Sequence, residues 1–111
     1  MTRVLVCGGR DYTDRDAVFR ALDRLAPTVV ITGGCPTGAD MHAERWTYER
    51  GVPVVRYPAD WQRYGDAAGP VRNQLMLSAE RPDLVLAFTG GKGTNDMVRR
   101  ARAAGVPVMK G

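Results

Sequence analysis

The chain is short of the features that mark several common protein classes. Its 111 residues include two cysteines and a single histidine, His42, which has no acidic cluster beside it, so no metal site is expected. No apolar stretch approaches the roughly 18 residues that a membrane-spanning helix needs, and the first residues lack a secretory signal pattern. We therefore expect no membrane partner and a cytoplasmic location.

A large excess of positive or negative charge is also lacking. Sixteen Lys and Arg residues stand against twelve Asp and Glu residues, and the net charge of +4 favours anionic partners only weakly. The basic residues are scattered and most lie beside acidic ones, which is not typical of a nucleic-acid-binding surface. The composition, 44% hydrophobic and 25% charged, is that of a globular protein, and the length predicts a single domain over residues 1–111.

Short runs rich in Val, Leu and Ile alternate with amphipathic stretches along the whole chain. The runs predict strands over residues 3–7, 28–32, 53–57, 84–88 and 106–109. The stretches between them predict helices over residues 14–25, 39–50, 70–80 and 95–104. Because parallel strands need crossover helices, this order predicts an α/β fold with a doubly wound, parallel five-stranded sheet, in the strand order 3-2-1-4-5. Residues 58–69 form the longest irregular piece, which is typical of a functional or mobile loop.

Eight of the thirteen glycines lie in three places, each directly after a predicted strand. In a doubly wound sheet, ligands bind beyond the carboxyl ends of the strands, where the strand order reverses. Glycine lets backbone N–H groups approach a ligand closely, and the positive end of the next helix favours an anion such as phosphate. We therefore expect one ligand-binding rim that includes Gly8, Gly9, Gly33, Gly34, Gly38, Gly90, Gly91 and Gly93.

The spacing of these glycines does not match the common phosphate-binding motifs. TGGKGT lacks the four residues that a P-loop places between its first glycine and Gly-Lys, and GGR after the first strand is not GxGxxG. A standard nucleoside triphosphatase or dinucleotide site is therefore disfavoured.

Polar side chains near the rim each have two interpretations. Lys92 is either a phosphate counter-charge or a solvated surface residue, and Thr94 either binds a ligand oxygen or caps the helix. Asp40 either caps its helix or accepts hydrogen bonds from ribose or a base. Arg72, with Asn73 beside it, projects towards the rim or is solvated. Trp61 either stacks on a base or anchors the long loop on the core.

Five ordered motifs carry a family resemblance over nearly the whole chain. VCGGRDY, GGCPTGAD, PADW, GPVRNQLM and GGKGTNDM resemble the YspA-type, cpYpsA-related branch of the SLOG superfamily. This superfamily has Rossmann-like domains and includes the LOG phosphoribohydrolases and the DNA-processing protein DprA. The resemblance implies a nucleotide or nucleotide-derived ligand at the glycine rim.

The likeness to LOG implies an N-glycosidic hydrolase, since those enzymes use a PGGxGTxxE motif with an upstream Arg. Here Thr89 stands at the motif's proline and Met97 at its glutamate, so Asp96 would have to substitute for the glutamate. Glycosidic cleavage needs a carboxylate near the anomeric carbon. The catalytic candidates are therefore Asp40 and Asp96, with Arg72 as the upstream arginine.

The likeness to DprA rests on GGCPTGADMHAERW and VRNQLM and implies single-stranded DNA binding. Such binding needs a positive groove with stacking aromatic residues, which the modest charge of this chain does not favour. The expected function is a sensor or binding module for a nucleotide-type ligand, with a hydrolase and a DNA-binding protein as alternatives. No cofactor is expected, and the sequence leaves open whether two copies pair. The ligand-binding candidates are Gly8, Gly9, Arg10, Gly33, Gly34, Gly38, Asp40, Trp61, Arg72, Asn73, Gly90, Gly91, Lys92, Gly93 and Thr94.

Overall fold

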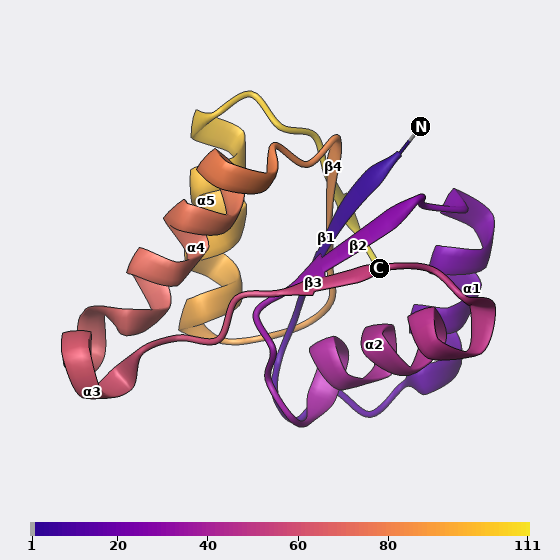
Figure 1. The fold of residues 1–111 in the computed structure, drawn as a ribbon, viewed down its shortest axis with the longest axis horizontal. Helices are drawn as coiled ribbons and strands as arrows, with labels where there is room; N and C mark the ends of the chain where they lie inside the picture. The colour runs from indigo at the N-terminus through magenta and orange to yellow at the C-terminus, as the bar shows by residue number, and fades with distance from the viewer. Residues whose placement is uncertain (1) are drawn as a thin grey trace.

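The computed structural model describes residues 2–111, which form a parallel sheet between two layers of helices (Figure 1). The strands are β1 (Arg3–Cys7), β2 (Val29–Thr32), β3 (Val54–Arg56), β4 (Leu84–Ala87) and β5 (Val108–Lys110). Their order across the sheet is β3-β2-β1-β4-β5, and every neighbouring pair is parallel. The predicted Rossmann-like α/β fold and its strand order are confirmed.

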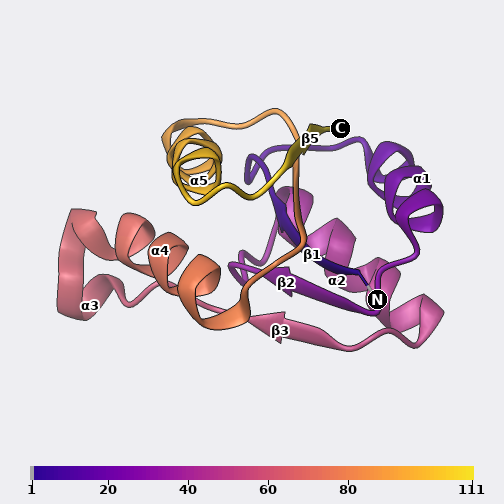
Figure 2. The same ribbon diagram turned by 90° about the horizontal axis from the view of Figure 1, so that it is seen from above.

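The helices cover both faces of this sheet, as Figure 2 shows. They are α1 (Arg15–Leu25), α2 (Gly38–Arg50), α3 (Trp61–Tyr64), α4 (Ala68–Glu80) and α5 (Lys92–Ala103), with a 3₁₀ turn η1 (Gly65–Ala67) between α3 and α4. The helices α1 and α2 lie on one face, and α4 and α5 pack together on the other. The short helix α3 lies beyond the N-terminal end of α4 (Figure 1).

The central strand β1 explains why the strands read as continuous apolar runs. Successive side chains of a strand point to opposite faces, and here both faces are covered. Val4 and Val6 pack in the core beneath α1 and α2, whereas Leu5 and Cys7 pack in the core beneath α4 and α5. All four side chains are buried.

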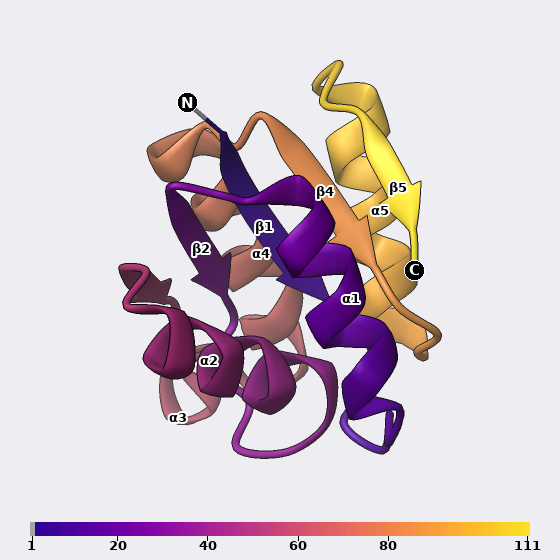
Figure 3. The same cartoon turned by 90° about the vertical axis from the view of Figure 1, so that its right-hand side faces the viewer.

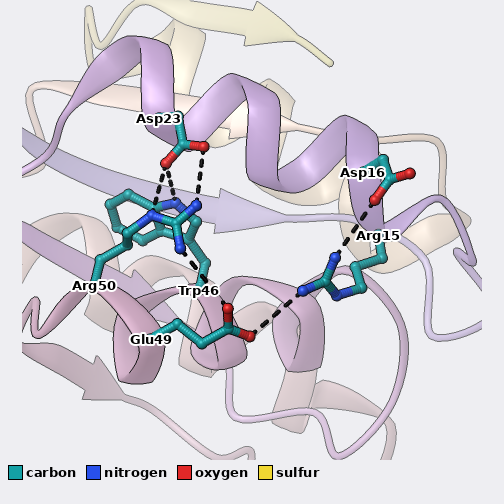
Figure 4. Close-up of polar contacts among 6 residues, drawn as sticks. All are labelled: Arg15, Asp16, Asp23, Trp46, Glu49 and Arg50. Carbon is teal, nitrogen blue, oxygen red and sulfur yellow. Dashed lines mark hydrogen bonds and ion pairs between the residues drawn. The ribbon is translucent and has the colours of Figure 1, made fainter.

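Polar contacts join α1 to α2 along their outer edge (Figure 4). Trp46 is buried, and its Nε1 donates to Oδ1 of Asp23 at 2.8 Å. Arg50 donates to both oxygens of Asp23 at 3.0 and 3.1 Å, and Arg15 reaches Glu49 at 3.4 Å. Because surface ion pairs contribute little to stability, these contacts mainly fix how the two helices lie against each other.

Most element ends lie within two residues of the sequence prediction, and three of the differences have a structural reason or bear on the site. The segment predicted as irregular, residues 58–69, contains α3 and η1, and Asp60 caps α3 by accepting from the backbone N–H of Arg63 at 3.1 Å. The last helix begins three residues earlier than predicted. The last strand begins two residues later, because the N–H of Val106 donates to the carbonyl of Ala101 at the end of α5.

All five strands run in the same direction, so their carboxyl ends lie at one edge of the sheet (Figure 3). The three glycine-rich loops that follow β1, β2 and β4 therefore share this edge. Within residues 2–111, no helix has the length and apolar character to span a membrane.

Candidate functional site

The three glycine-rich loops surround one cavity of about 1220 Å³ at the carboxyl edge of the sheet. The long segment between β3 and α4 closes its remaining side with Pro58, Ala59 and Trp61. The predicted site residues that line this cavity are Gly8, Gly9, Arg10, Gly33, Gly34, Asp40, Trp61, Arg72, Asn73, Gly90, Gly91, Lys92, Gly93 and Thr94. Two predicted residues, Gly38 and Asp96, do not line it.

Gly38 has a structural role behind the cavity wall. Its φ is +73°, and a Cβ at this position would lie 2.1 Å from the carbonyl oxygen of Gly9. That oxygen also accepts from the N–H of Ala39 at 3.2 Å, which pins the start of α2 to the loop after β1. Only glycine fits so close an approach in this backbone conformation.

Two helices that begin beside the cavity, α2 and α5, have no side-chain cap at their N-termini. Thr37 precedes α2 and Gly91 precedes α5, and neither provides a capping hydrogen bond from a side chain. The first hydrogen bond within α5 runs from the N–H of Asn95 to the carbonyl of Gly91. The backbone N–H groups of Lys92, Gly93 and Thr94 therefore have no partner within the helix, and all three residues line the cavity.

Thr94 is not the cap of α5, so this alternative from the sequence is wrong. It is the third residue of the helix and is buried. A Cβ on Gly90 would lie 2.2 Å from its Oγ1, so the Thr94 hydroxyl lies directly against the backbone of the glycine loop. Its side chain helps to shape the loop that faces the cavity.

Arg72 joins three parts of the cavity wall. Its Nη1 donates to the carbonyl oxygens of Gly33 at 2.9 Å and Tyr57 at 3.3 Å, and its Nε donates to Asn73 Oδ1 at 2.9 Å. Within the described chain, its Nη2 donates to no protein atom, and Arg72 lines the cavity. The structure therefore leaves part of this guanidinium free to bind a ligand.

Asn73 holds the start of α5 in place. Its Nδ2 donates to the carbonyl of Gly93 at 3.2 Å and to Asp96 Oδ2 at 3.0 Å. The side chain is buried, and its partners lie 20 and 23 residues further along the chain. Asn73 thus positions the N-terminal turn of α5 relative to α4.

Asp40 is a buried carboxylate on the cavity wall. Its Oδ2 accepts from the N–H of Cys35 at 3.2 Å, and it lies near the Cα of Gly33, as does the Arg72 guanidinium. Burial raises the pKa of Asp40 to about 6, and the charge of Glu44 also raises it, against the Cys35 hydrogen bond and the charge of Arg72. Asp40 forms no helix-capping bond, since the residue that precedes α2 is Thr37.

Asp96 is not on the rim, and its prediction as a cavity-facing catalytic group is corrected. Its carboxylate accepts from Arg99 at 2.7 Å and from Arg100 at 2.9 Å, besides the bond from Asn73. Burial acts to raise its pKa, but the bonds from Asn73 and Arg100 and the charges of both arginines lower it below the ordinary value. Asp96 is a structural anion between α4 and α5.

The mouth of the cavity carries the exposed candidates. Arg10 and Lys92 are exposed and bring positive charge to two sides. Trp61 is 56% exposed, and its ring lies beside Gly69 near the start of α4. Its ring is therefore available to a planar ligand.

Sequence reasoning did not single out thirteen further residues that line the cavity. They are Val6, Cys7, Asp11, Tyr12, Thr13, Asp14, Cys35, Pro36, Thr37, Pro58, Ala59, Met76 and Thr89. All but Thr13, Asp14 and Thr89 lie within the five family motifs, which was the available signal. Burial and the charge of Asp40 raise the pKa of Cys7 to about 12, so its thiol stays protonated at neutral pH. Among residues 2–111, no three His, Cys, Asp or Glu side chains cluster in a way that would hold a metal ion.

Comparisons of the sequence with known proteins find a family and a relative. The model of the YspA, cpYpsA-related SLOG family matches residues 2–64, which is more than half of the chain. The gene 61 protein of Mycobacterium phage D29 is 40% identical over 121 residues, an alignment that covers 98% of this chain and 95% of the phage protein.

Two solved structures share the fold. The molybdenum cofactor binding protein of Rippkaea orientalis has a TM-score of 0.69 and 21% identity, covering 97% of this chain and 73% of its own. The Moco carrier protein of Chlamydomonas reinhardtii has a TM-score of 0.72 and 19% identity, covering 98% and 75%. At these identities the likeness concerns the fold.

Proposed function

The chain belongs to the YspA, cpYpsA-related SLOG family, and from this premise we propose that it is a binding module for a nucleotide or nucleotide-derived small molecule. The ligand occupies the cavity at the carboxyl edge of the sheet. In this proposal the protein acts as a sensor, and occupancy of the cavity changes a surface that a partner reads.

One observation carries the proposal. The uncapped N-terminus of α5 and a partly unused arginine meet in one cavity. Backbone N–H groups at a helix start, together with the positive end of the helix dipole, favour phosphate. Small-molecule pockets enclose roughly 300–1,000 Å³, so a cavity of about 1220 Å³ has room for a base, a sugar and phosphates.

The polar groups suggest how such a ligand lies. Its phosphate would accept from the N–H groups of Gly93 and Thr94, with Lys92 as counter-charge. Its planar ring would extend towards Trp61, where an exposed indole offers a stacking surface. Asp40 and Arg72 lie between these ends, where a carboxylate accepts from ribose hydroxyls or ring N–H groups and a guanidinium donates to ring or phosphate oxygens.

The structural neighbours support the wider class of ligand. Both are described as proteins that bind or carry the molybdenum cofactor, which is a small molecule. The molybdenum cofactor therefore belongs in the same panel as nucleotides.

Mass spectrometry of small molecules released from the purified protein tests the proposal, together with thermal shifts in a panel of nucleotides, ADP-ribose derivatives and the molybdenum cofactor. We expect a released ligand, or a stabilising shift that Arg72→Ala and Gly91→Val abolish. A Cβ at Gly91 would meet no protein atom within 4 Å, so Gly91→Val fills ligand space without a clash in the fold.

The matched control is Arg102→Ala, which removes the same charge from the exposed last turn of α5, away from the cavity. It should keep the full thermal shift. If nothing is released and no member of the panel shifts the melting curve, small-molecule binding fails. If Arg102→Ala loses the shift as fully as Arg72→Ala, the effect is general charge and the cavity is not the site.

A second candidate is a hydrolase of the nucleotide N-glycosidic bond. The observation that favours it is Asp40, a buried carboxylate on the cavity wall whose pKa of about 6 suits proton transfer near neutral pH. With Asp96 engaged by two arginines, the other acids on the cavity wall are the exposed Asp11 and Asp14. Arg72 would hold the phosphate.

Incubation with nucleoside monophosphates, followed by chromatography for free base and ribose phosphate, separates the two candidates. Release of base that Asp40→Asn abolishes would place the hydrolase ahead of the sensor. If a nucleoside monophosphate binds and no base is released, the hydrolase is excluded and the binding module is supported.

Two further possibilities remain proposals. Single-stranded DNA is the ligand to assay if the small-molecule panel fails, because the DprA-like motifs lie on the same rim. A homodimer is the other, and sedimentation of the full chain over a range of concentrations tests it.

A further inference from the structure

Two side chains of opposite charge meet at one point of the cavity wall, beside Gly33. A Cβ built on Gly33 would lie 2.9 Å from Cζ of Arg72 and 3.2 Å from Oδ2 of Asp40. Within residues 2–111 no ion pair joins these two groups, since the guanidinium donates to Asn73 and to backbone carbonyls instead. The carboxylate and the guanidinium therefore lie side by side, and each keeps hydrogen-bonding capacity for a ligand.

Asp40 is only 9% exposed, yet the protein uses just part of its acceptor capacity. Its Oδ2 accepts from the N–H of Cys35 at 3.2 Å, and a backbone bond from Gly33 also acts to lower its pKa. In the part of the chain that the structure describes, no side chain donates to it. A carboxylate has about four acceptor sites, so about half of them remain open on a side chain that lines the cavity.

Arg72 provides a donor next to these acceptor sites. Its Nε and Nη1 are engaged by Asn73, Gly33 and Tyr57, whereas Nη2 has no partner among residues 2–111. Over the same residues, no side-chain nitrogen or oxygen is both buried and without a partner, so Nη2 is accessible. Because Arg72 lines the cavity, a ligand acceptor can reach this nitrogen.

The surroundings of the pair favour a neutral, flat group over a phosphate. The Asp40 carboxylate repels an anion that approaches Arg72 beside it. The buried side chains of Val6, Cys7 and Met76 also line the cavity, and the charges of Asp40 and Arg72 both act on the Cys7 thiol, so this apolar lining adjoins the pair. A heterocyclic base has apolar faces and a polar edge, which suits such a place better than a ribose does.

We propose that Asp40 and Arg72 bind the edge of a guanine base and are the specificity-determining residues of the cavity. This rests on the proposed function, since it names the base of the same nucleotide-type ligand. Guanine presents two adjacent donors, N1–H and the 2-amino group, beside one acceptor, O6. The two donors match the open acceptor sites of Asp40, and O6 matches Nη2 of Arg72.

Adenine fits the same pair less well. Its edge offers one amino donor and an acceptor nitrogen in place of N1–H. Whichever way adenine turns, it gives the Asp40 carboxylate one donor fewer than guanine does. An acceptor site of a buried carboxylate is then left unfilled, which costs binding free energy.

Isothermal titration calorimetry of the full chain with the 5′-monophosphates of guanosine, inosine and adenosine tests the base, because the three ligands share one sugar and one phosphate. We expect the guanosine nucleotide to bind at least about tenfold more tightly than the adenosine nucleotide. The inosine nucleotide lacks the 2-amino group and should lie between them. The 2′-deoxy guanosine nucleotide should bind as tightly as its ribose form, because Asp40 accepts from the base.

A pair of matched variants tests the role of Asp40. Asp40→Asn exchanges an acceptor oxygen for an amino donor, so it should remove the preference for guanine over adenine. Asp16→Asn makes the same change on an exposed acid of α1, away from the cavity, and should keep that preference. Circular dichroism checks that both variants are folded.

Three results would overturn the proposal while the binding module stands. They are equal binding of the guanosine and adenosine nucleotides, an unchanged preference in folded Asp40→Asn, and a preference lost as fully in Asp16→Asn. Equal binding of the two bases with a large loss for the 2′-deoxy form would assign Asp40 to the ribose instead. If none of these nucleotides binds, the guanine edge is overturned, and the wider ligand panel decides separately whether the binding module fails.

Discussion

The starts of α2 and α5 look alike in outline and differ in electrostatics. Each begins at the carboxyl edge of the sheet after a glycine-rich loop, and each carries a buried aspartate in its first turns, Asp40 at 9% and Asp96 at 8% exposure. Yet burial raises the pKa of Asp40 to about 6, whereas Asp96 has a pKa below its ordinary value. Similar exposed fractions therefore do not decide the state of a carboxylate.

The balance between burial and bonding differs at the two sites: burial outweighs the other influences on the pKa of Asp40, whereas the bonds from Asn73 and Arg100 outweigh burial at Asp96. The charges one turn further along each helix act in the same directions. Four residues after Asp40 stands Glu44, a like charge, while three and four residues after Asp96 stand Arg99 and Arg100. Residues at these spacings are neighbours on a helix surface. At the start of α5, the Asp96 carboxylate is therefore ion-paired within the fold. At the start of α2, the Asp40 carboxylate lies on the cavity wall.

Glycine substitutions should separate the two helix starts most strongly. Gly38→Ala, at the first residue of α2, combines a φ of +73° with a Cβ 2.1 Å from the Gly9 oxygen. We expect it to lower the free energy of unfolding by about 3 kcal/mol or more. Gly93→Ala, at the second residue of α5, meets nothing within 4 Å and should raise that free energy by about 0.5 kcal/mol.

Urea denaturation of both variants gives the comparison. A loss for Gly93→Ala as large as that for Gly38→Ala would mean that the two starts are equally constrained, and the contrast drawn between them would fail.

Removal of the Asp96 carboxylate should have the next largest effect on the free energy of unfolding. Asp96→Ala leaves the Asn73 amide without its acceptor and two arginines without their shared partner, of which Arg99 is mostly exposed. We expect a loss of about 2 kcal/mol in the free energy of unfolding. Because the pKa of Asp96 is lowered on folding, its contribution exists above pH 3.8 and disappears as the pH falls below that value.

Denaturation curves at pH 7 and at pH 3 distinguish this cause from simple loss of packing. The difference between wild type and Asp96→Ala should shrink at the lower pH, and a constant difference would point to packing.

Removal of the cavity acid should have the opposite sign to the removal of Asp96 and a smaller size. Asp40 is protonated more easily in the folded chain, so its contribution to stability is present below pH 3.8 and is lost as the pH rises through about 6. Asp40→Asn should therefore match the wild type near pH 4 and exceed its free energy of unfolding by about 1 kcal/mol at pH 7.

Thermal and urea unfolding across this pH range measure the effect on stability. A ligand-binding assay of the same variant measures how much affinity is lost. A variant that is less stable than the wild type at pH 7 would show that the Asp40 carboxylate is stabilising, and the contrast with Asp96 would disappear.

The fold was predictable because its signals are regular. Continuous apolar runs separated by helical stretches admit few topologies besides a parallel doubly wound sheet, and the structure has the strand order that was expected. The short helix α3 was missed since four residues carry no periodicity, although Asp60 before Trp61 was a capping signal.

The glycine loops of the site were predictable from the sequence. The hydrogen-bond and ion-pair partners of its side chains were less so. Asp96 was misjudged because a family motif drew attention to its position, whereas Arg99 and Arg100, visible in the sequence, were the better guide to its role. Arg72 could be named from its motif, but its bonds to Gly33 and Tyr57 join segments 39 and 15 residues away, and no local pattern encodes such contacts.

The two cysteines on the cavity wall differ enough in accessibility that one of them can serve as a single attachment site for a fluorescent dye. Cys7 is buried and its thiol stays protonated at neutral pH, since its pKa is raised to about 12, whereas Cys35 is partly exposed beside Pro36 and Thr37. A thiol-reactive dye should therefore label the native chain at Cys35 alone. Its fluorescence would then report the filling and emptying of the cavity in real time, with no residue of the protein replaced.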